Sequence, residues 1–294
     1  MPVTVRGVDG ESVLADAVAA YRIALSDRLL AAYALGSLAH GGFSELVSDV
    51  DLGLIVKDPL RADDLDTIQA VADAEKAKGS ELRSRLSVFW GTPSTLRGDV
   101  VGGRFPALDR LDLLESGRLL AGSDAARSNL PRPSSQELIV TGAEFALDYL
   151  AGIQSQTSAD DASLGSMRLA GEGAVEEVRT PEMLVARGVR RVTKLVLFPV
   201  RFLYTAATGR VGTNDAAVDH YLETPGAASG ELVAAARSWR TGVRFDEHTA
   251  IDLLDRQLVP LYRHYIEDHM ARLAALGRED LAQAFRGWRE RLIA

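Results

Sequence analysis

The stretch ALGSLAHGGFSELVSDVDLGLIV, residues 34–56, decides the fold of this chain. Two short apolar runs, each typical of a buried strand, flank a polar loop. The first run ends in Gly36 and Ser37, and the second opens with Asp49 and Asp51. Because side chains alternate between the two faces of a strand, both carboxylates are expected on one face, with their Cα atoms about 6–7 Å apart.

Two carboxylates at this spacing suit a shared Mg²⁺ ion. Magnesium prefers oxygen ligands and commonly takes one or two carboxylates, completing its octahedron with water and substrate phosphate oxygens. Gly36 allows the backbone to approach a phosphate, and Ser37 adds a hydroxyl beside its N–H. The alternative is an exposed strand end that carries two acids beside an ordinary turn. The presence of Ser37 twelve residues before Asp49 argues against that alternative.

The motif extends over both runs, as Gly-Ser-x-Ala-x-Gly at residues 36–41 and Ser-Asp-x-Asp-Leu at residues 48–52. It resembles the nucleotidyltransferase superfamily that includes DNA polymerase beta and the aminoglycoside adenylyltransferases. The resemblance implies that Asp49 and Asp51 hold Mg²⁺ and act in catalysis. It also implies that Gly36 and Ser37 bind the β- and γ-phosphates of ATP.

Composition predicts a folded protein of two domains. The chain has 294 residues, 47% of them apolar, which is enough for two substantial cores. It has no cysteine, which excludes disulfides and thiolate metal sites and fits a cytoplasmic location. The net charge of −8 disfavours long nucleic acid as a partner and is compatible with a cationic small substrate. The first residues lack the pattern of a signal peptide, and Pro199 and Arg201 interrupt the most apolar later run, so no membrane segment is expected.

The pattern of elements divides the chain near residue 130. Residues 1–130 alternate strand-like and helix-like segments and predict a mixed α/β domain, which the resemblance makes the catalytic nucleotidyltransferase domain. The expected strands are residues 30–35, 49–56, 85–90 and 118–120, and the expected helices are residues 11–26, 62–78 and 108–115. Gly-x-x-x-x-Gly-Lys-Ser/Thr and Gly-x-Ser-x-Gly are absent, so P-loop and hydrolase chemistry are not indicated.

Residues 131–294 predict an all-α domain that begins with a linker at residues 131–135. Its expected helices are residues 136–154, 181–208, 215–222, 230–239, 248–273 and 279–292. Residues 155–178 form a long polar connection, which is expected to be either a lid or a disordered loop.

The second domain carries its own resemblance. The stretch RFLYTAATGRV at residues 201–211, with Asp215 beyond it, looks like the C-terminal helical domain of the streptomycin and spectinomycin adenylyltransferases. In that family the helical domain clamps nucleotide and substrate, and basic residues on this helix reach the triphosphate. Lys194 and Arg201 are the candidates here, because they recur with Arg187 and Arg191 at helical spacings. A solvated basic face is the alternative. Asn214 stands where the family has a lysine.

A second departure concerns the general base. Members of the superfamily usually carry a third carboxylate on the third strand, and this chain offers Ser87 there. A serine cannot remove a proton near neutral pH, so either another residue is the base or the activity is weak or lost. Glu144, one helical turn from Asp148, is the candidate catalytic base by analogy with aminoglycoside nucleotidyltransferases. A solvent-facing helix surface is the alternative for both acids.

The function expected from these observations is Mg²⁺-dependent transfer of AMP from ATP to a hydroxyl of a small molecule. An aminoglycoside-like acceptor, and with it antibiotic resistance, is the first expectation from the resemblance. Two alternatives stay open. One is a nucleotidyltransferase that acts on tRNA or protein, and the other is a degenerate, non-catalytic regulator that binds nucleotide.

Overall fold

The structure is a computed structural model that describes residues 9–153 and 172–293. It divides into two compact units, Met1–Pro133 and Ser134–Ala294, which we call unit 1 and unit 2. Among the described helices, none has both the length and the apolar character needed to cross a membrane.

Unit 1 is built on a four-stranded sheet with the order β3-β2-β1-β4. The strands are β1 (Leu29–Leu35), β2 (Val50–Val56), β3 (Leu86–Gly91) and β4 (Arg118–Gly122). β1 pairs antiparallel with β2 and β4, and β2 pairs parallel with β3. The four expected strands are confirmed to within about two residues at each end. The two runs that flank the polar loop are therefore neighbours in the middle of the sheet.

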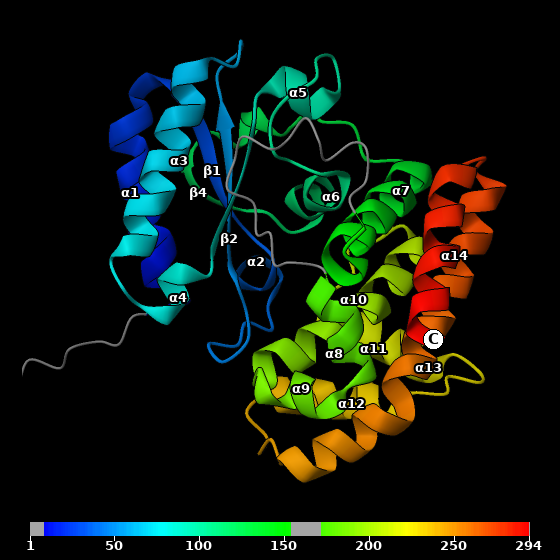
Figure 1. Cartoon of the computed structure of the whole chain (residues 1–294). Coiled ribbons are helices and arrows are strands. Elements are labelled where there is room, and N and C mark those ends of the chain that lie inside the picture. Colours follow the sequence, from blue (N-terminus) through cyan, green and yellow to red (C-terminus); the bar gives the residue numbers. More distant parts are fainter. Residues whose placement is uncertain (1–8, 154–171, 294) are drawn as a thin grey trace, which may run out of the picture. The chain divides into compact units, whose positions relative to one another are not determined.

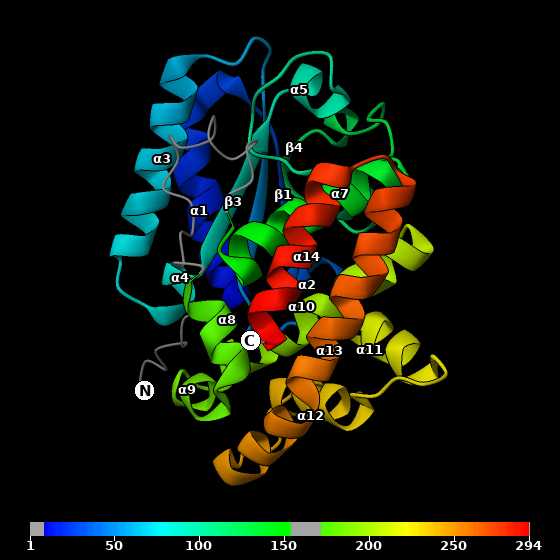
Figure 2. The same ribbon diagram turned by 45° about the vertical axis from the view of Figure 1, so that its right-hand side comes forward.

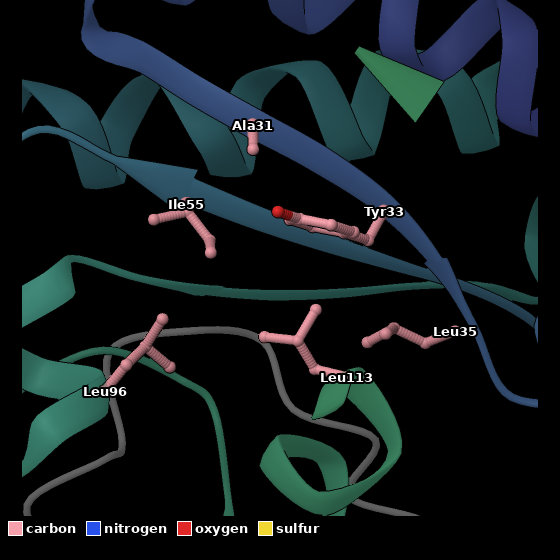
Figure 3. Packing of buried hydrophobic residues seen from close by; sticks show 6 residues of the cluster. All are labelled: Ala31, Tyr33, Leu35, Ile55, Leu96 and Leu113. Carbon is pink, nitrogen blue, oxygen red and sulfur yellow. The ribbon is translucent and has the colours of Figure 1, made fainter. Parts of the chain in front are cut away.

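Helices cover both faces of this sheet. On one face, α1 (Gly10–Leu25) and α3 (Ala62–Ala77) lie side by side (Figure 1). On the other face, Leu96 of α5 (Pro93–Arg97) and Leu113 of α6 (Ala107–Glu115) meet the side chains of the central strands. Figure 3 shows this cluster, in which the labelled side chains of the two strands point towards Leu96 and Leu113. Its buried members are Ala31, Tyr33, Leu35, Ile55, Leu96 and Leu113.

Three short helices of unit 1 lie outside the predicted elements. They are α2 (Ser37–His40), α4 (Glu81–Ser84) and α5. Each contains about one turn, so no repeat of apolar residues marks it in the sequence. Residues at its N-terminus stabilise α5: the Thr92 side chain accepts a hydrogen bond from the N–H of Thr95, and Pro93 occupies the first turn.

Unit 2 is helical in its described parts, and its helices largely follow the predicted segments. They are α7 (Ser135–Ala146), α8 (Glu172–Arg179), α9 (Pro181–Ala186), α10 (Val189–Thr208), α11 (Asn214–Glu223), α12 (Gly230–Arg240), α13 (Glu247–Ala275) and α14 (Glu279–Ile293). The long helices α13 and α14 lie side by side (Figures 1 and 2). α10 packs against α7, α11, α12 and α13, which makes it the central helix of the unit.

Three details of unit 2 differ from the prediction. The expected helix at residues 181–208 is broken at Gly188, whose φ of 86° suits glycine, and α10 starts after it. The expected helix at residues 136–154 changes to a π-helix at Leu147–Ala151 and ends at Gly152. The expected polar connection at residues 155–178 contains α8 from Glu172 onward, and residues 154–171 lie outside the described part of the chain.

An aromatic cluster fills the contact between α13 and α14. His269 lies 4.3 Å from Tyr265 and 6.0 Å from Phe285, measured between ring centroids. The imidazole is 1% exposed, and burial lowers the pKa of His269 despite the neighbouring carboxylate of Asp268.

Candidate functional site

The Gly36 turn, residues 35–37, joins the end of β1 to α2. Gly36 has φ 59° and ψ −149°, a backbone conformation that is essentially restricted to glycine. A Cβ atom placed on Gly36 would lie 2.3 Å from Oδ2 of Asp51, far inside van der Waals contact. The sequence therefore needs glycine here for two reasons, its backbone conformation and the close approach of the Asp51 carboxylate.

Asp51 reaches this position through the pairing of β1 with β2. It lies directly opposite Leu35, so both side chains point to the face that α5 and α6 cover. Asp49 comes one residue before β2, and both aspartates are partly exposed. Within the described ranges, no three His, Cys, Asp or Glu side chains are placed to hold a metal ion together.

Ser87 lies on β3 directly beside Asp51 in the parallel register. Paired residues of adjacent strands point to the same face, so the Ser87 hydroxyl belongs to the same side of the sheet as the Asp51 carboxylate. The serine is 9% exposed. That Ser87 replaces a carboxylate remains a prediction.

The sequence interpretation missed Asp112, which the fold brings to the same turn. This residue lies on α6, and its Oδ2 accepts a hydrogen bond from the Gly36 N–H at 2.5 Å. Its side chain is buried, with 7% exposed. In the sequence, the one local feature that marks Asp112 is its place between the apolar residues Leu111 and Leu113. Nothing local connects that acid to a turn 76 residues earlier.

The N–H groups of the turn have different surroundings. The Gly36 N–H donates to a carboxylate in this structure. Ser37 and Leu38 begin α2, where backbone N–H groups have no acceptor within the helix.

Glu144 and Asp148, the candidates for the base, both belong to unit 2. Glu144 lies on α7, and its Oε1 is 3.8 Å from Nη2 of Arg278. The pKa of Arg278 is raised first by its hydrogen bond to Asp280, and Glu144 adds a further favourable charge. Asp148 lies in the π-helical segment. The regular turn that was expected to join the two acids is therefore interrupted between them.

The predicted basic face of α10 splits into two groups. Arg191 donates from Nε to the Glu177 carboxylate at 2.7 Å, and its Nη1 donates to the Tyr149 hydroxyl at 3.1 Å. Burial lowers the pKa of Arg191, but Glu177 outweighs it, so the pKa stays above the ordinary value. This charge is already balanced inside unit 2.

Lys194 and Arg201 form the second group, separated by seven residues and so placed on one face of α10. Arg201 donates from Nε to the carbonyl of Gly212 at 2.5 Å, and its guanidinium lies 5.8 Å from the ring centroid of Phe198. These contacts tie Arg201 to the loop between α10 and α11.

Asn214, which stands where the resembled family has a lysine, lies beside an arginine of another helix. Asn214 begins α11, and its amide oxygen, when turned towards Arg240, accepts hydrogen bonds from Nε and Nη2 at 3.2 Å. Burial lowers the pKa of Arg240, Asp215 opposes this, and the positive charge of Arg201 lowers the pKa further. A positive charge therefore lies beside Asn214, although it is contributed by α12.

The structure matches that of the spectinomycin adenyltransferase AAD(9) from Enterococcus faecialis, determined with ATP and spectinomycin. The match has a TM-score of 0.51 at 12% sequence identity and covers 85% of this chain and 99% of that one. The chain thus shares the fold of an adenylyltransferase. No protein-family model matches the chain, and the search of curated proteins found no relative.

Proposed function

We propose that this chain is a nucleotidyltransferase that moves AMP from ATP to a hydroxyl of a small molecule. The observation that carries the proposal is the close approach of Asp51 to the Gly36 turn, at the end of the two central strands where β1 ends and β2 begins. The fold shared with an ATP-binding adenylyltransferase supports it. A cationic, aminoglycoside-like acceptor fits the net charge of −8 and the spectinomycin bound by that neighbour.

The donor set fits Mg²⁺, because two carboxylates with open positions for water and phosphate oxygens are its usual protein ligands. Asp49 and Asp51 are the residues that would hold it. When bound, the ion neutralises the charge that develops on the phosphates during transfer.

The remaining roles fall to the protein's own groups. Ser37 offers its N–H and hydroxyl to the β- and γ-phosphates, and Lys194 and Arg201 offer positive charge to the same groups. In the reaction, the acceptor oxygen forms a bond to the α-phosphorus while the bond to the bridging oxygen breaks. Pyrophosphate leaves, and the hydroxyl proton passes to a base, for which Glu144 is the candidate.

The test is transfer of radiolabel from [α-³²P]ATP, with Mg²⁺, to a panel of hydroxylated acceptors that includes spectinomycin and streptomycin. We expect labelled product from the parent chain and a large loss in Asp51→Asn. Asp66→Asn, which changes an exposed aspartate of α3, is the matched control and should transfer normally. Glu144→Gln should lower transfer by about 10²–10⁴-fold without changing ATP affinity if Glu144 is the base. If tRNA or protein is labelled instead, the acceptor is a macromolecule and not a small molecule.

A second candidate is a non-catalytic domain that binds nucleotide, and the observation that favours it is Ser87. The serine pairs with Asp51 on the neighbouring strand and carries no carboxylate that could act as a base. Under this alternative the parent chain binds Mg-ATP in calorimetry but labels no acceptor. Transfer to any acceptor, abolished by Asp51→Asn, excludes it.

A further inference from the structure

Asp112 is a buried carboxylate that the proposed chemistry leaves without a role. It lies on α6 with 7% of its surface exposed, and its Oδ2 accepts the Gly36 N–H at 2.5 Å. Burying a charged group is costly unless hydrogen bonds compensate. The hydrogen bond to the Gly36 N–H is one contact of this buried acid, and it ties α6 to the turn.

The turn is also the surface against which Asp51 rests. The Asp51 carboxylate lies so close to Gly36 that a Cβ would come within 2.3 Å of Oδ2. The two residues therefore constrain each other: a shift of the Gly36 backbone towards β2 would push the carboxylate away, and a shift in the opposite direction would leave it loose. Asp112 binds the N–H of this same residue and so restrains both movements.

We propose that Asp112 is a positioning residue that fixes the metal-binding carboxylate of Asp51 through the Gly36 backbone. The inference rests on the proposed function, since it takes Asp51 to be a ligand. Mg²⁺ demands near-ideal octahedral geometry, and a site held too loosely loses affinity. Removal of a group that orients a metal-binding side chain typically lowers metal affinity or activity by about 10- to 100-fold.

Two substitutions distinguish the role of the Asp112 hydrogen bond from the role of its negative charge. Asp112→Asn keeps an oxygen that can accept the Gly36 N–H but removes the charge, whereas Asp112→Ala removes the acceptor. Asp112→Ser, whose hydroxyl ends one bond short of Oδ2, replaces the alanine variant should that variant fail to fold. Asp66→Ala is the control, because this exposed acid lies on α3.

Two measurements on the full-length variants report how Asp112 affects the Gly36 turn and the binding of Mg²⁺. Amide hydrogen exchange at Gly36, followed by NMR, reports the hydrogen bond without any ligand. Calorimetry of ATP binding, with Mg²⁺ and with EDTA, reports how much Mg²⁺ strengthens binding. In Asp112→Ala we expect faster exchange at Gly36 and about a 10- to 100-fold loss of the Mg²⁺-dependent affinity. Asp112→Asn should stay close to the parent in both.

Other results overturn the proposal in recognisable ways. Equal losses in Asp112→Asn and Asp112→Ala would show that the charge acts, and tighter ATP binding in Asp112→Ala would show that Asp112 blocks a phosphate. Faster exchange with unchanged Mg²⁺ dependence would show a structural contact alone. If the parent itself shows no Mg²⁺-dependent ATP binding, the proposed function fails first, and the exchange data still report whether the contact forms.

Discussion

Replacing Gly36 with alanine tests the link between the turn and Asp51 most directly. The φ of 59° and ψ of −149° at this residue cost about 1–3 kcal/mol for a residue with a side chain. The added Cβ would lie 2.3 Å from Oδ2 of Asp51. An ordinary C···O contact is about 3.3–3.6 Å, so the carboxylate must move by about 1 Å. Since Mg–O bonds are about 2.0–2.1 Å long with little tolerance, a displacement of that size should remove Asp51 as a ligand.

The matched control is Gly41→Ala. Gly41 has φ 91° and ψ 172°, so it carries comparable backbone strain, but no atom lies within 4 Å of a Cβ there. Both variants should melt about 3–10 °C below the parent in differential scanning calorimetry. Gly36→Ala alone should lose about 10-fold or more of the Mg²⁺-dependent ATP affinity. Equal Mg²⁺ dependence in the two variants would refute the reasoning, because Asp51 would then not depend on the contact with residue 36.

Four further outcomes are expected. Lys194→Ala should weaken ATP binding more than AMP binding in calorimetry, because AMP lacks the β- and γ-phosphates; equal losses would remove the residue from the triphosphate site. Ser87→Glu should raise the rate of nucleotidyl transfer above the parent if the chain has lost its base, and should leave it unchanged if another residue serves. The pKa of His269 is lowered in the folded protein, so the unfolded chain binds a proton more readily. The contribution of this group to the free energy of unfolding is therefore complete above about pH 6.5 and is lost as the pH falls through the lower folded pKa. His269→Phe should flatten this pH dependence in urea titrations at pH 5 and 7. Glu177→Gln should lower the free energy of unfolding by about 3–5 kcal/mol, because it leaves the charge of Arg191 buried without its carboxylate, and a loss below 1 kcal/mol would contradict the pairing.

The sequence predicted those parts of the fold whose signal is local and repeated. The strands around residues 29–35 and 50–56 are apolar runs with polar boundaries, and α13 and α14 carry apolar residues at helical spacing over several turns. Their positions were predicted to within a few residues. The one-turn helices such as α2 have no such repeat, so the sequence pattern could not indicate them.

The candidate site divides in the same way. Asp51 and Gly36 could be proposed from the sequence because strand alternation and a Gly-Ser motif are visible in a short stretch. Asp112 was not, because its partner lies 76 residues away and the contact depends on how α6 packs over the sheet. The π-helical turn at Leu147–Ala151 was also missed, since the sequence there continues an ordinary helical pattern.

The pairing of β1 with β4 has a practical consequence for the preparation of unit 1 as a separate protein. β4 comes last in the sheet's sequence order, yet it covers one edge of β1, from Ala31 opposite Gly122 to Ala34 opposite Arg118. A fragment that stops before residue 118 would expose a row of unpaired backbone groups on an apolar strand, and such an edge recruits other chains. Leu130 also packs against the cluster beneath the sheet. A soluble fragment should therefore extend past residue 130, and one cut earlier is expected to aggregate even though it contains every residue of the Gly36 turn and both aspartates.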